Sequence, residues 1–320
     1  MTISLNRRQF VAASLITALC ANSTLAAQPA TTAEWTLPIR NAGDAPGNGF
    51  TVRHGFACEN TWFSLGCWHT AEDWYRADDA ETTGAEVLAV TAGEVLWIGS
   101  DYPGRVVLIQ HPDGLYGMYG HLDYAVDVVV GQKVKAGQLL GRVFAWTDGR
   151  APSHLHFEIR TFFYHPIVNG ETPKYGFNCG YQCPPGPGYW PIDDSQHPAQ
   201  IGWRNPQHVI HRALVASGRM TEVVVASTAD GLSGPVRSAP THRASEVEDI
   251  TLRAGDRFRV VGAEIGDPAS TETSAHAYRL WYRVELPSGR IGWLPAVLAS
   301  DRDVASDGRP TGLRILLLPD

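Results

Sequence analysis

The stretch Ser153-His154-Leu155-His156-Phe157-Glu158-Ile159-Arg160 alternates strictly between polar and apolar residues. Alternation of this kind predicts a half-buried β-strand, because successive side chains of a strand point to opposite faces. His154 and His156 therefore share one face of the strand, and the apolar residues point into a core. One imidazole of such a pair suits a metal ligand and the other proton transfer. The H-x-H pattern alone also fits two histidines on a solvated strand.

Two further histidine motifs precede this strand. His69 and Asp73 lie four residues apart in the stretch Gly66-Cys67-Trp68-His69-Thr70-Ala71-Glu72-Asp73-Trp74. This spacing lets both side chains reach one ion from a helical turn or from a loop that enters a strand, and the glycine and tryptophans favour the loop. An isolated H-x-x-x-D also fits an ordinary surface pair. The second motif, Tyr119-Gly120-His121-Leu122-Asp123, adds a third histidine.

The rest of the chain predicts a mainly β protein. Short apolar runs separated by Gly, Pro and Asp turns indicate strands, and helical periodicity is absent from the first block. The expected strands of that block are 87–90, 93–98, 105–110, 115–119, 132–134 and 141–144. A short helix is expected at 205–217, followed by strands at 222–227, 235–238, 256–261, 280–286 and 290–294. The second set predicts a small β-barrel.

Length and charge narrow the class of protein. The chain has 320 residues, 44% of them hydrophobic, which is enough for two domains with a buried core. Its formal net charge is -7 at pH 7. Because a nucleic-acid partner requires a positive protein face, this balance argues against nucleic-acid binding.

The N-terminal residues 1–27 have the pattern of an export signal. Arg7 and Arg8 precede an apolar run, and small residues follow near Ala26. The Arg-Arg-x-Phe pattern predicts a signal of the twin-arginine type; an ordinary secretory signal with incidental arginines is the alternative. We therefore expect a periplasmic or secreted protein, with no stable membrane insertion once the signal is removed. Residues 28–49, small and rich in Pro and Gly, predict a linker.

Removal of the signal leaves four cysteines, Cys58, Cys67, Cys179 and Cys183. An even number of cysteines in an exported chain suggests disulfides. Three pairings are possible; the local ones, Cys58 with Cys67 and Cys179 with Cys183, are expected because each closes a short loop. A thiolate zinc site is not expected, because C-x-x-C spacing is absent.

The order of the motifs resembles the lysostaphin-type (LytM-like) zinc metallopeptidases. H-x-x-x-D, Y-x-H-L, a Gly-rich G-x-x-V-x-x-G-Q-x-x-G segment (131–141) and H-L-H-F-E follow one another between residues 50 and 165. The resemblance implies an antiparallel-sheet peptidase domain in which His69, Asp73 and His156 hold one zinc ion. It assigns catalytic roles to His121 and His154. The family usually has H-x-G-x-D where this chain has Ala71, so the local turn is expected to differ.

The chemistry of these residue types agrees with that assignment. Three protein ligands with an open fourth position are typical of a catalytic zinc site, and a water bound there is acidified towards hydroxide. Since no H-E-x-x-H helix supplies a glutamate base, His121 and His154 must orient water, stabilise the oxyanion or protonate the leaving amine. Glu72 and Glu158 fit either partners of the ligand imidazoles or structural residues.

The sequence thus predicts a peptidase domain at 50–215 and a second domain at 218–300. A long loop at 161–203, rich in Cys, Pro and aromatic residues, either shapes the substrate groove or forms a surface excursion. The motifs between 235 and 294 resemble a bacterial SH3-like domain, which implies either cell-wall binding or simple packing on the peptidase domain. Residues 301–320 are expected to form a C-terminal tail.

The expected function is that of an exported, zinc-dependent endopeptidase which hydrolyses peptide cross-links of bacterial peptidoglycan, with D,D-type specificity. The protein is expected to be a monomer. The alternative is a catalytically silent cell-wall-binding regulator that resembles the amidase activators. Such relatives generally lack the ligands, whereas here all five site positions are filled.

Overall fold

The computed structural model describes residues 33–61, 63–100, 104–147, 151–176, 182–299 and 314–319. The expected signal at 1–27 and Cys179 lie outside these ranges. Within the described residues the chain is built of antiparallel strands and two α-helices, which confirms the expected mainly β fold. No helix in this part of the chain has the length and apolar character to cross a membrane.

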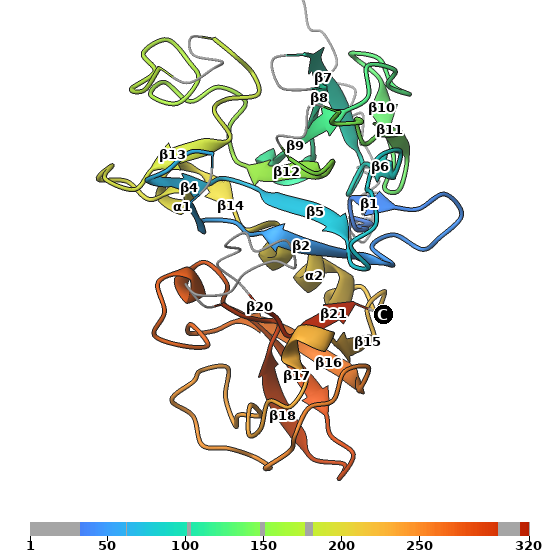
Figure 1. The fold of residues 1–320 in the computed structure, drawn as a ribbon, viewed down its shortest axis with the longest axis vertical. Coiled ribbons are helices and arrows are strands. Elements are labelled where there is room, and N and C mark those ends of the chain that lie inside the picture. The colour runs from blue at the N-terminus through green and yellow to red at the C-terminus, as the bar shows by residue number, and fades with distance from the viewer. Residues whose placement is uncertain are drawn as a thin grey trace, which may run out of the picture. The chain divides into compact units, whose positions relative to one another are not determined.

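The central sheet is organised around β12 (Leu155–Arg160), the strand predicted from the H-x-H stretch. Its strand order is β10-β7-β8-β9-β12-β5-β2, with β14 also paired to β12 (Figure 1). The other strands are β2 (Phe50–His54), β5 (Glu72–Arg76), β7 (Gly93–Gly99), β8 (Arg105–Gln110), β9 (Tyr116–Leu122), β10 (Lys133–Val134) and β14 (Trp203–Arg204). The predicted strands 93–98 and 105–110 are therefore confirmed.

Both faces of β12 are buried, which differs from the half-buried strand expected from its alternation. All six residues of β12 are buried, including Glu158 and Arg160 at 0% exposure. Alternation reports only that the two faces differ in polarity. Here the polar face is covered by other parts of the chain, so its charged groups are paired inside the protein.

Two small sheets flank the central sheet. One contains β1 (Ile39–Arg40), β6 (Glu86–Leu88) and β11 (Leu139–Arg142), and the other contains β3 (Glu59–Asn60), β4 (Cys67–His69) and β13 (Tyr189–Pro191). The expected linker is packed from Trp35 onward, because Trp35, Leu37 and Ile39 are buried in the core. Most of that segment thus belongs to the fold.

The C-terminal part of the chain begins with two helices, α1 (Pro198–Ile201) and α2 (Pro206–Ala216). Helix α2 confirms the expected helix; Asn205 caps it by accepting a hydrogen bond from the amide of His208. A five-stranded sheet follows, in the order β18-β17-β16-β15-β21. The strands after α2 are β15 (Glu222–Val225), β16 (Arg257–Ile265), β17 (Leu280–Glu285), β18 (Ile291–Pro295), β19 (Val297–Leu298), β20 (Arg314–Ile315) and β21 (Leu317–Pro319).

The end of the expected C-terminal tail is part of this sheet. Strand β21 pairs with β15, and Leu316 and Leu317 are buried. One cluster of buried apolar residues runs from Trp35 to Leu317, and the described residues from Ala33 onward form one compact unit. The boundary expected near residue 217 is therefore crossed by a continuous core.

The predicted disulfide between Cys58 and Cys67 is wrong, because the two residues keep separate thiols. Strand pairing opposes Asn60 to Cys67 and Glu59 to Trp68, and the amide of His69 donates to the carbonyl of Cys58. The two cysteines are therefore two positions out of register, whereas a disulfide needs Cα atoms about 5.5 Å apart. Cys183 takes part in a disulfide. Since Cys179 lies outside the described residues, the Cys179–Cys183 pairing stays a prediction.

Candidate metal centre

Three strands bring His69, Asp73 and His156 together. His69 is the last residue of β4, Asp73 lies in β5, and Asp73 is the direct cross-strand partner of His156 in β12. The turn at Thr70 and Ala71 joins β4 to β5, so the H-x-x-x-D motif spans two sheets, as the loop interpretation implied. All three side chains are buried.

Their donor atoms form a nearly equilateral triangle. The Nε2 atom of His69 lies 3.2 Å from Nδ1 of His156 and 3.3 Å from Oδ1 of Asp73, and His156 Nδ1 lies 3.2 Å from the same Oδ1. In a tetrahedral zinc site with bonds of 2.0–2.1 Å, two ligand atoms are about 3.3–3.4 Å apart. The rings of His69 and His156 are inclined at 71°, so both ring planes can contain one ion. The three donors fit a zinc ion, with a fourth position for water.

His54, which the motifs did not single out, also lies in this cluster. Ligand atoms of His54, His69 and Asp73 are all within 4.8 Å of one another, and these residues form a group that could hold a metal ion. However, the rings of His54 and His69 are stacked at 4.0 Å and only 6° from parallel. An imidazole lone pair lies in its ring plane, so two stacked rings cannot both aim at one ion. His54 therefore fits a neighbour that contacts Asp73, at 3.5 Å, better than a joint ligand with His69.

The electrostatics suit a cation at the triangle. Burial lowers the pKa of His69 to about 4, so this imidazole is neutral at pH 7. Burial acts to raise the pKa of Asp73, but His69, His154 and His156 outweigh it and hold that pKa well below its usual range. Burial also acts to lower the pKa of His156, yet Asp73 and Glu158 raise it to about 9. A metal ion bound at Nδ1 of His156 would replace the proton that Asp73 favours at that atom, whereas Glu158 favours a proton on Nε2.

Each ligand imidazole is oriented by a second contact. The Nδ1 atom of His69 lies 3.3 Å from the Gly55 carbonyl, which leaves Nε2 for the ion. The Nε2 atom of His156 lies 3.5 Å from Oε1 of Glu158, which leaves Nδ1. Such contacts fix the tautomer and the ring orientation of metal-bound histidines. Of the two interpretations of Glu158 from sequence, the position supports the partner of a ligand imidazole.

Glu158 belongs to a buried network on the polar face of β12. Its Oε1 accepts a hydrogen bond of 2.6 Å from Thr70, and its Oε2 accepts one of 3.0 Å from the indole of Trp203. The guanidinium of Arg160 lies 3.4 Å from Oε2 and also donates to the carbonyls of Pro184 and Pro185. The loop expected at 161–203 thus contributes directly to the support of the metal centre.

Glu72, beside Asp73, faces the opposite side of β5 and contacts the C-terminal part of the chain. The hydroxyl of Tyr278 donates to Oε1 of Glu72 at 2.9 Å and accepts from the amide of Phe56 at 2.9 Å. Phe56 follows the Gly55 carbonyl that orients His69. A segment far away in sequence therefore helps to fix the loop next to the first ligand.

His154 and His121 lie beside the triangle without completing it. His154 Nε2 is 3.7 Å from Oδ2 of Asp73, and the ring centroids of His121 and His154 are 4.7 Å apart. The Nδ1 atom of His154 donates to the Pro152 carbonyl at 2.8 Å, so Nε2 carries the lone pair. Burial lowers the pKa of His154, which keeps this base neutral. The structure therefore brings together all five residues predicted from the motifs.

His121 has a left-handed backbone conformation with φ of 60°. Its neighbour Gly120 is paired with His156, so on a regular strand His121 would point to the other face of the sheet. The positive φ accompanies the contact of its ring with His154 and His156. Residues other than glycine held in this region cost about 1–3 kcal/mol each and occur at functional sites.

This strain predicts an unusual order of stability at residue 121. We expect His121→Gly to be more stable than His121→Ala by about 0.5–1 kcal/mol, because glycine adopts positive φ without the clash of a Cβ atom. Urea unfolding of the two variants measures the difference. Tyr116, in the same strand and without a positive φ, is the matched control: there Ala should be more stable than Gly. The same order at both residues would contradict strain at His121.

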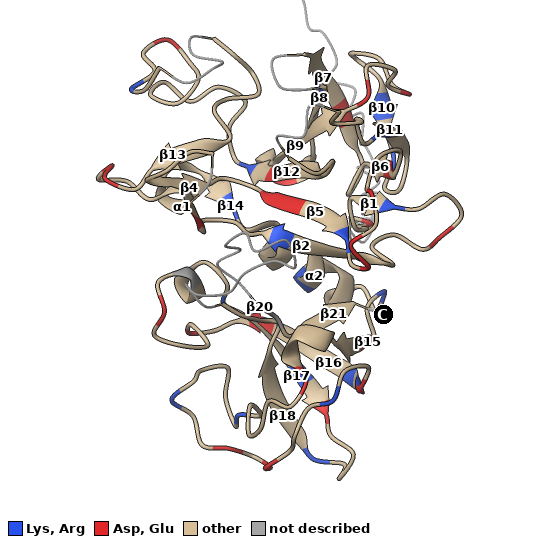
Figure 2. Cartoon of the chain, in the orientation of Figure 1, with Lys and Arg blue, Asp and Glu red and all other residues tan. Residues whose placement is uncertain are grey.

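Charged side chains and aromatic rings surround the metal centre. Figure 2 shows the acidic residues of β5 next to the basic residue of β2. Tyr75 stacks on His154 with centroids 4.9 Å apart, and Trp146 lies 5.7 Å from the same ring. Together, the three donors, two further imidazoles and an aromatic wall are suited to hydrolysis of a polarised carbonyl compound.

Comparison with known proteins agrees with this geometry. Residues 73–171 match the model of Peptidase family M23. This range contains Asp73, His121, His154 and His156, and His69 lies four residues before it. The chain thus carries an M23 peptidase domain, and the resemblance to the LytM-like peptidases is confirmed for this part of the chain.

One relative and two solved structures illustrate the extent of the similarity. The cell division protein DipM of Caulobacter vibrioides is 40% identical over 91 residues, which cover 28% of this chain and 14% of DipM. Lysostaphin from Staphylococcus simulans is 16% identical with a TM-score of 0.33, over 85% of this chain and 96% of that one. A zinc-containing peptidase from Vibrio cholerae is 25% identical with a TM-score of 0.28, over 39% and 36%. The chain spans only a small part of DipM.

Proposed function

We propose that this protein is an exported, zinc-dependent endopeptidase that hydrolyses peptide cross-links of bacterial peptidoglycan, with D,D-type specificity. The observation that carries the proposal is the triangle of donor atoms of His69, Asp73 and His156, with edges of 3.2–3.3 Å, next to two imidazoles that are not part of it. The M23 domain match supports the metallopeptidase chemistry.

The roles of the residues follow from their positions. Zinc bound by His69, Asp73 and His156 would acidify a water molecule and polarise the substrate carbonyl. His154, with its Nδ1 bonded to the Pro152 carbonyl, accepts a proton at Nε2 and returns it to the leaving amine. His121, against the ring of His154, stabilises negative charge on the carbonyl oxygen. Gly55 and Glu158 hold the two ligand imidazoles in place.

The alternative, a catalytically silent cell-wall-binding regulator, has no support in the site. Such a protein needs none of the five side chains, and here they converge with geometry suited to a metal ion and proton transfer. We retain as proposals the twin-arginine signal at 1–27, the monomeric state and an SH3-like role of residues 218–300 in binding the wall.

Digestion of purified, cross-linked peptidoglycan tests the proposal. We expect cross-linked dimers of stem peptides to disappear and monomers with a newly freed amino group to accumulate, because hydrolysis of the cross-link amide releases an amine. Mass analysis of the soluble fragments identifies the bond that is cut. The variant Asp73→Ala serves as the inactive control. Release of stem peptides from the sugar strands, with cross-links intact, would contradict the proposal.

A further inference from the structure

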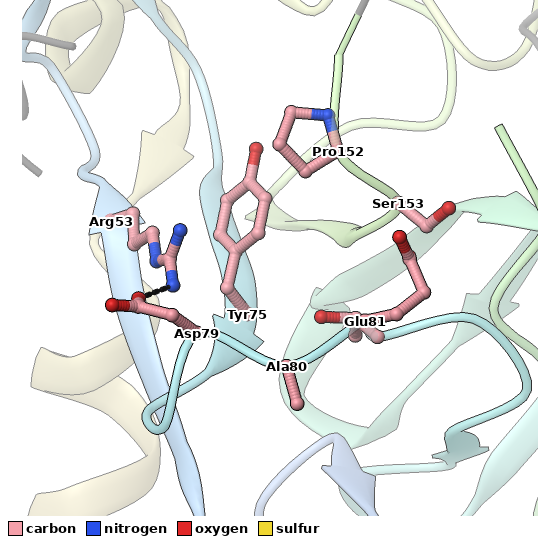
Figure 3. A pocket seen from close by; sticks show the side chains of 8 residues that line it. Arg53, Tyr75, Asp79, Ala80, Glu81, Pro152 and Ser153 are labelled. Carbon is pink, nitrogen blue, oxygen red and sulfur yellow. Dashed lines mark hydrogen bonds and ion pairs between the residues drawn. The ribbon is translucent and has the colours of Figure 1, made fainter. Parts of the chain in front are cut away.

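A pocket of about 340 Å³ opens beside His154. It is lined by residues of β2, β5, the turn after β5 and the segment that leads into β12, including Arg53, Tyr75, Glu81 and Ser153 (Figure 3). Tyr75 forms one wall and stacks on His154 with centroids 4.9 Å apart. Whatever occupies the pocket therefore lies one aromatic ring away from a side chain to which we assign proton transfer.

A β-bulge in β2 directs the Arg53 side chain towards this pocket. The register of β2 on β5 shifts between Val52 and His54, so Arg53 is the additional residue of the bulged strand. Asp73 and Tyr75, two apart on β5, share one face; His54 contacts Asp73, and the Arg53 guanidinium stands 5.0 Å over the Tyr75 ring. Two consecutive residues of β2 thus contact side chains on the same face of β5, which a regular strand does not allow.

Hydrogen bonds fix the Arg53 side chain in place without using all the donors of its guanidinium group. Its side chain is 15% exposed, and its Nη2 donates to the Arg76 carbonyl and to Asp79. No bond from Nε or Nη1 to another described residue is formed, so two of the three guanidinium nitrogens are available. A guanidinium presents five donors in a fork that matches a carboxylate. The fixed orientation and the open donors suit capture of a carboxylate from the substrate.

The other side of the pocket carries a negative charge. Figure 3 shows Glu81 next to Ser153, across the pocket from Arg53, with Tyr75 between them. Glu81 accepts hydrogen bonds from the amide and hydroxyl of Thr83, and within the described part of the chain no cationic side chain pairs with it. Partial burial acts to raise the pKa of Glu81, but bonds from Ser153 and Thr83 outweigh it and lower that pKa. Glu81 is thus an anion without a counter-ion, which suits an ammonium group.

We propose that this pocket is a substrate subsite that binds a zwitterionic amino-acid group next to the scissile amide, with Arg53 taking its carboxylate and Glu81 its ammonium group. The proposal deepens the proposed function and rests on it for the position of the scissile bond. It assigns this chain a preference for peptides in which a side chain next to the cleaved amide carries both a free carboxylate and a free amine, because the amine and the carboxyl that form the amide are not available for binding.

Matched peptides test the preference. Three cross-link peptides are compared that differ only beside the scissile amide: one with free carboxylate and amine, one with the carboxylate amidated and one with the amine acetylated. We expect wild-type kcat/KM to be about 10- to 100-fold higher for the first peptide, the range for a hydrogen bond to a charged group. Arg53→Ala should abolish discrimination against the amide, and Glu81→Gln should abolish discrimination against the acetylated peptide.

The control variant is Arg259→Ala, which removes an exposed arginine bonded to Glu285 in the five-stranded sheet and should leave the preference unchanged. Zinc content and thermal unfolding of the variants show that the metal centre and fold are intact. The subsite would be overturned if the Arg53 and Glu81 variants lost kcat/KM equally on all three peptides. It would also be overturned if they lost none on any peptide. Loss of discrimination in one variant alone would overturn the role of the other side chain.

A second measurement separates the subsite from the proposed function. Alanine, alaninamide and acetate are titrated into the full-length protein while the backbone amide signals of Ala80 and Ser153 are followed by NMR. We expect alanine to shift these signals in the wild type but not in Arg53→Ala, and the other two compounds to act more weakly. If no peptide is cut but alanine binds as expected, the function fails and the subsite stands. If peptides are cut but alanine does not bind, the subsite fails alone.

Discussion

Replacing Asp73 by Ala is expected to leave a protein that is inactive and poor in zinc. The substitution removes one corner of the donor triangle, whose edges are 3.2–3.3 Å, and a site with two remaining protein ligands should lose most of its metal. Asp73 also contacts His54 and His154, so its replacement removes the carboxylate that these two rings share.

His121→Ala is expected to behave differently, because His121 lies beside the triangle and not in it. We expect close to one zinc ion per chain and a loss of activity of about 10²- to 10⁴-fold, as for removal of a group that handles a proton or stabilises an oxyanion. Elemental analysis of the purified variants, together with a hydrolysis assay, compares the two. A metal-free His121→Ala beside a zinc-loaded Asp73→Ala would show that the motifs have been assigned the wrong way round.

Of the substitutions proposed for this protein, Glu158→Ala is expected to cause the largest decrease in the free energy of unfolding. Glu158 and Arg160 are both fully buried, and the guanidinium lies 3.4 Å from the carboxylate. Removing one partner of a buried pair leaves an uncompensated charge, which typically costs about 3–5 kcal/mol. The loss of the acceptor for Thr70 and Trp203 acts in the same direction. Denaturant unfolding of the metal-free protein measures this effect without the contribution of zinc.

Two comparisons make the Glu158 result specific. Glu285→Ala breaks an exposed ion pair with Arg259 and should change the free energy of unfolding by less than about 1 kcal/mol. Glu158→Gln keeps the shape and one acceptor, and should weaken zinc binding by about 10- to 100-fold, because the contact to His156 Nε2 loses its charge. A Glu158→Ala protein as stable as the Glu285 variant would show that Arg160 is satisfied by the carbonyls of Pro184 and Pro185 alone.

The strand that organises the sheet and the five residues at its centre were predictable from the sequence. Alternation is a local property, so β12 was predictable from eight consecutive residues, and the resemblance of the ordered motifs to the lysostaphin-type peptidases implied His69, Asp73, His121, His154 and His156. The helix expected at 205–217 corresponds to α2, which begins after the cap Asn205 with a proline in its first turn.

The residues that surround that centre are set by long-range contacts and could not be predicted from the sequence. His54 belongs to no motif and reaches Asp73 through the pairing of β2 with β5, and the bulge at Arg53 is a matter of register. Register also separates Cys58 from Cys67, although the two are close in sequence. The polar face of β12 looked solvated because alternation cannot tell water from a covering loop; Pro184, Pro185 and Trp203 bury it. Such contacts join segments far apart in the chain, and they depend on cross-strand pairing and on packing between sheets, which leave no periodic trace in the sequence.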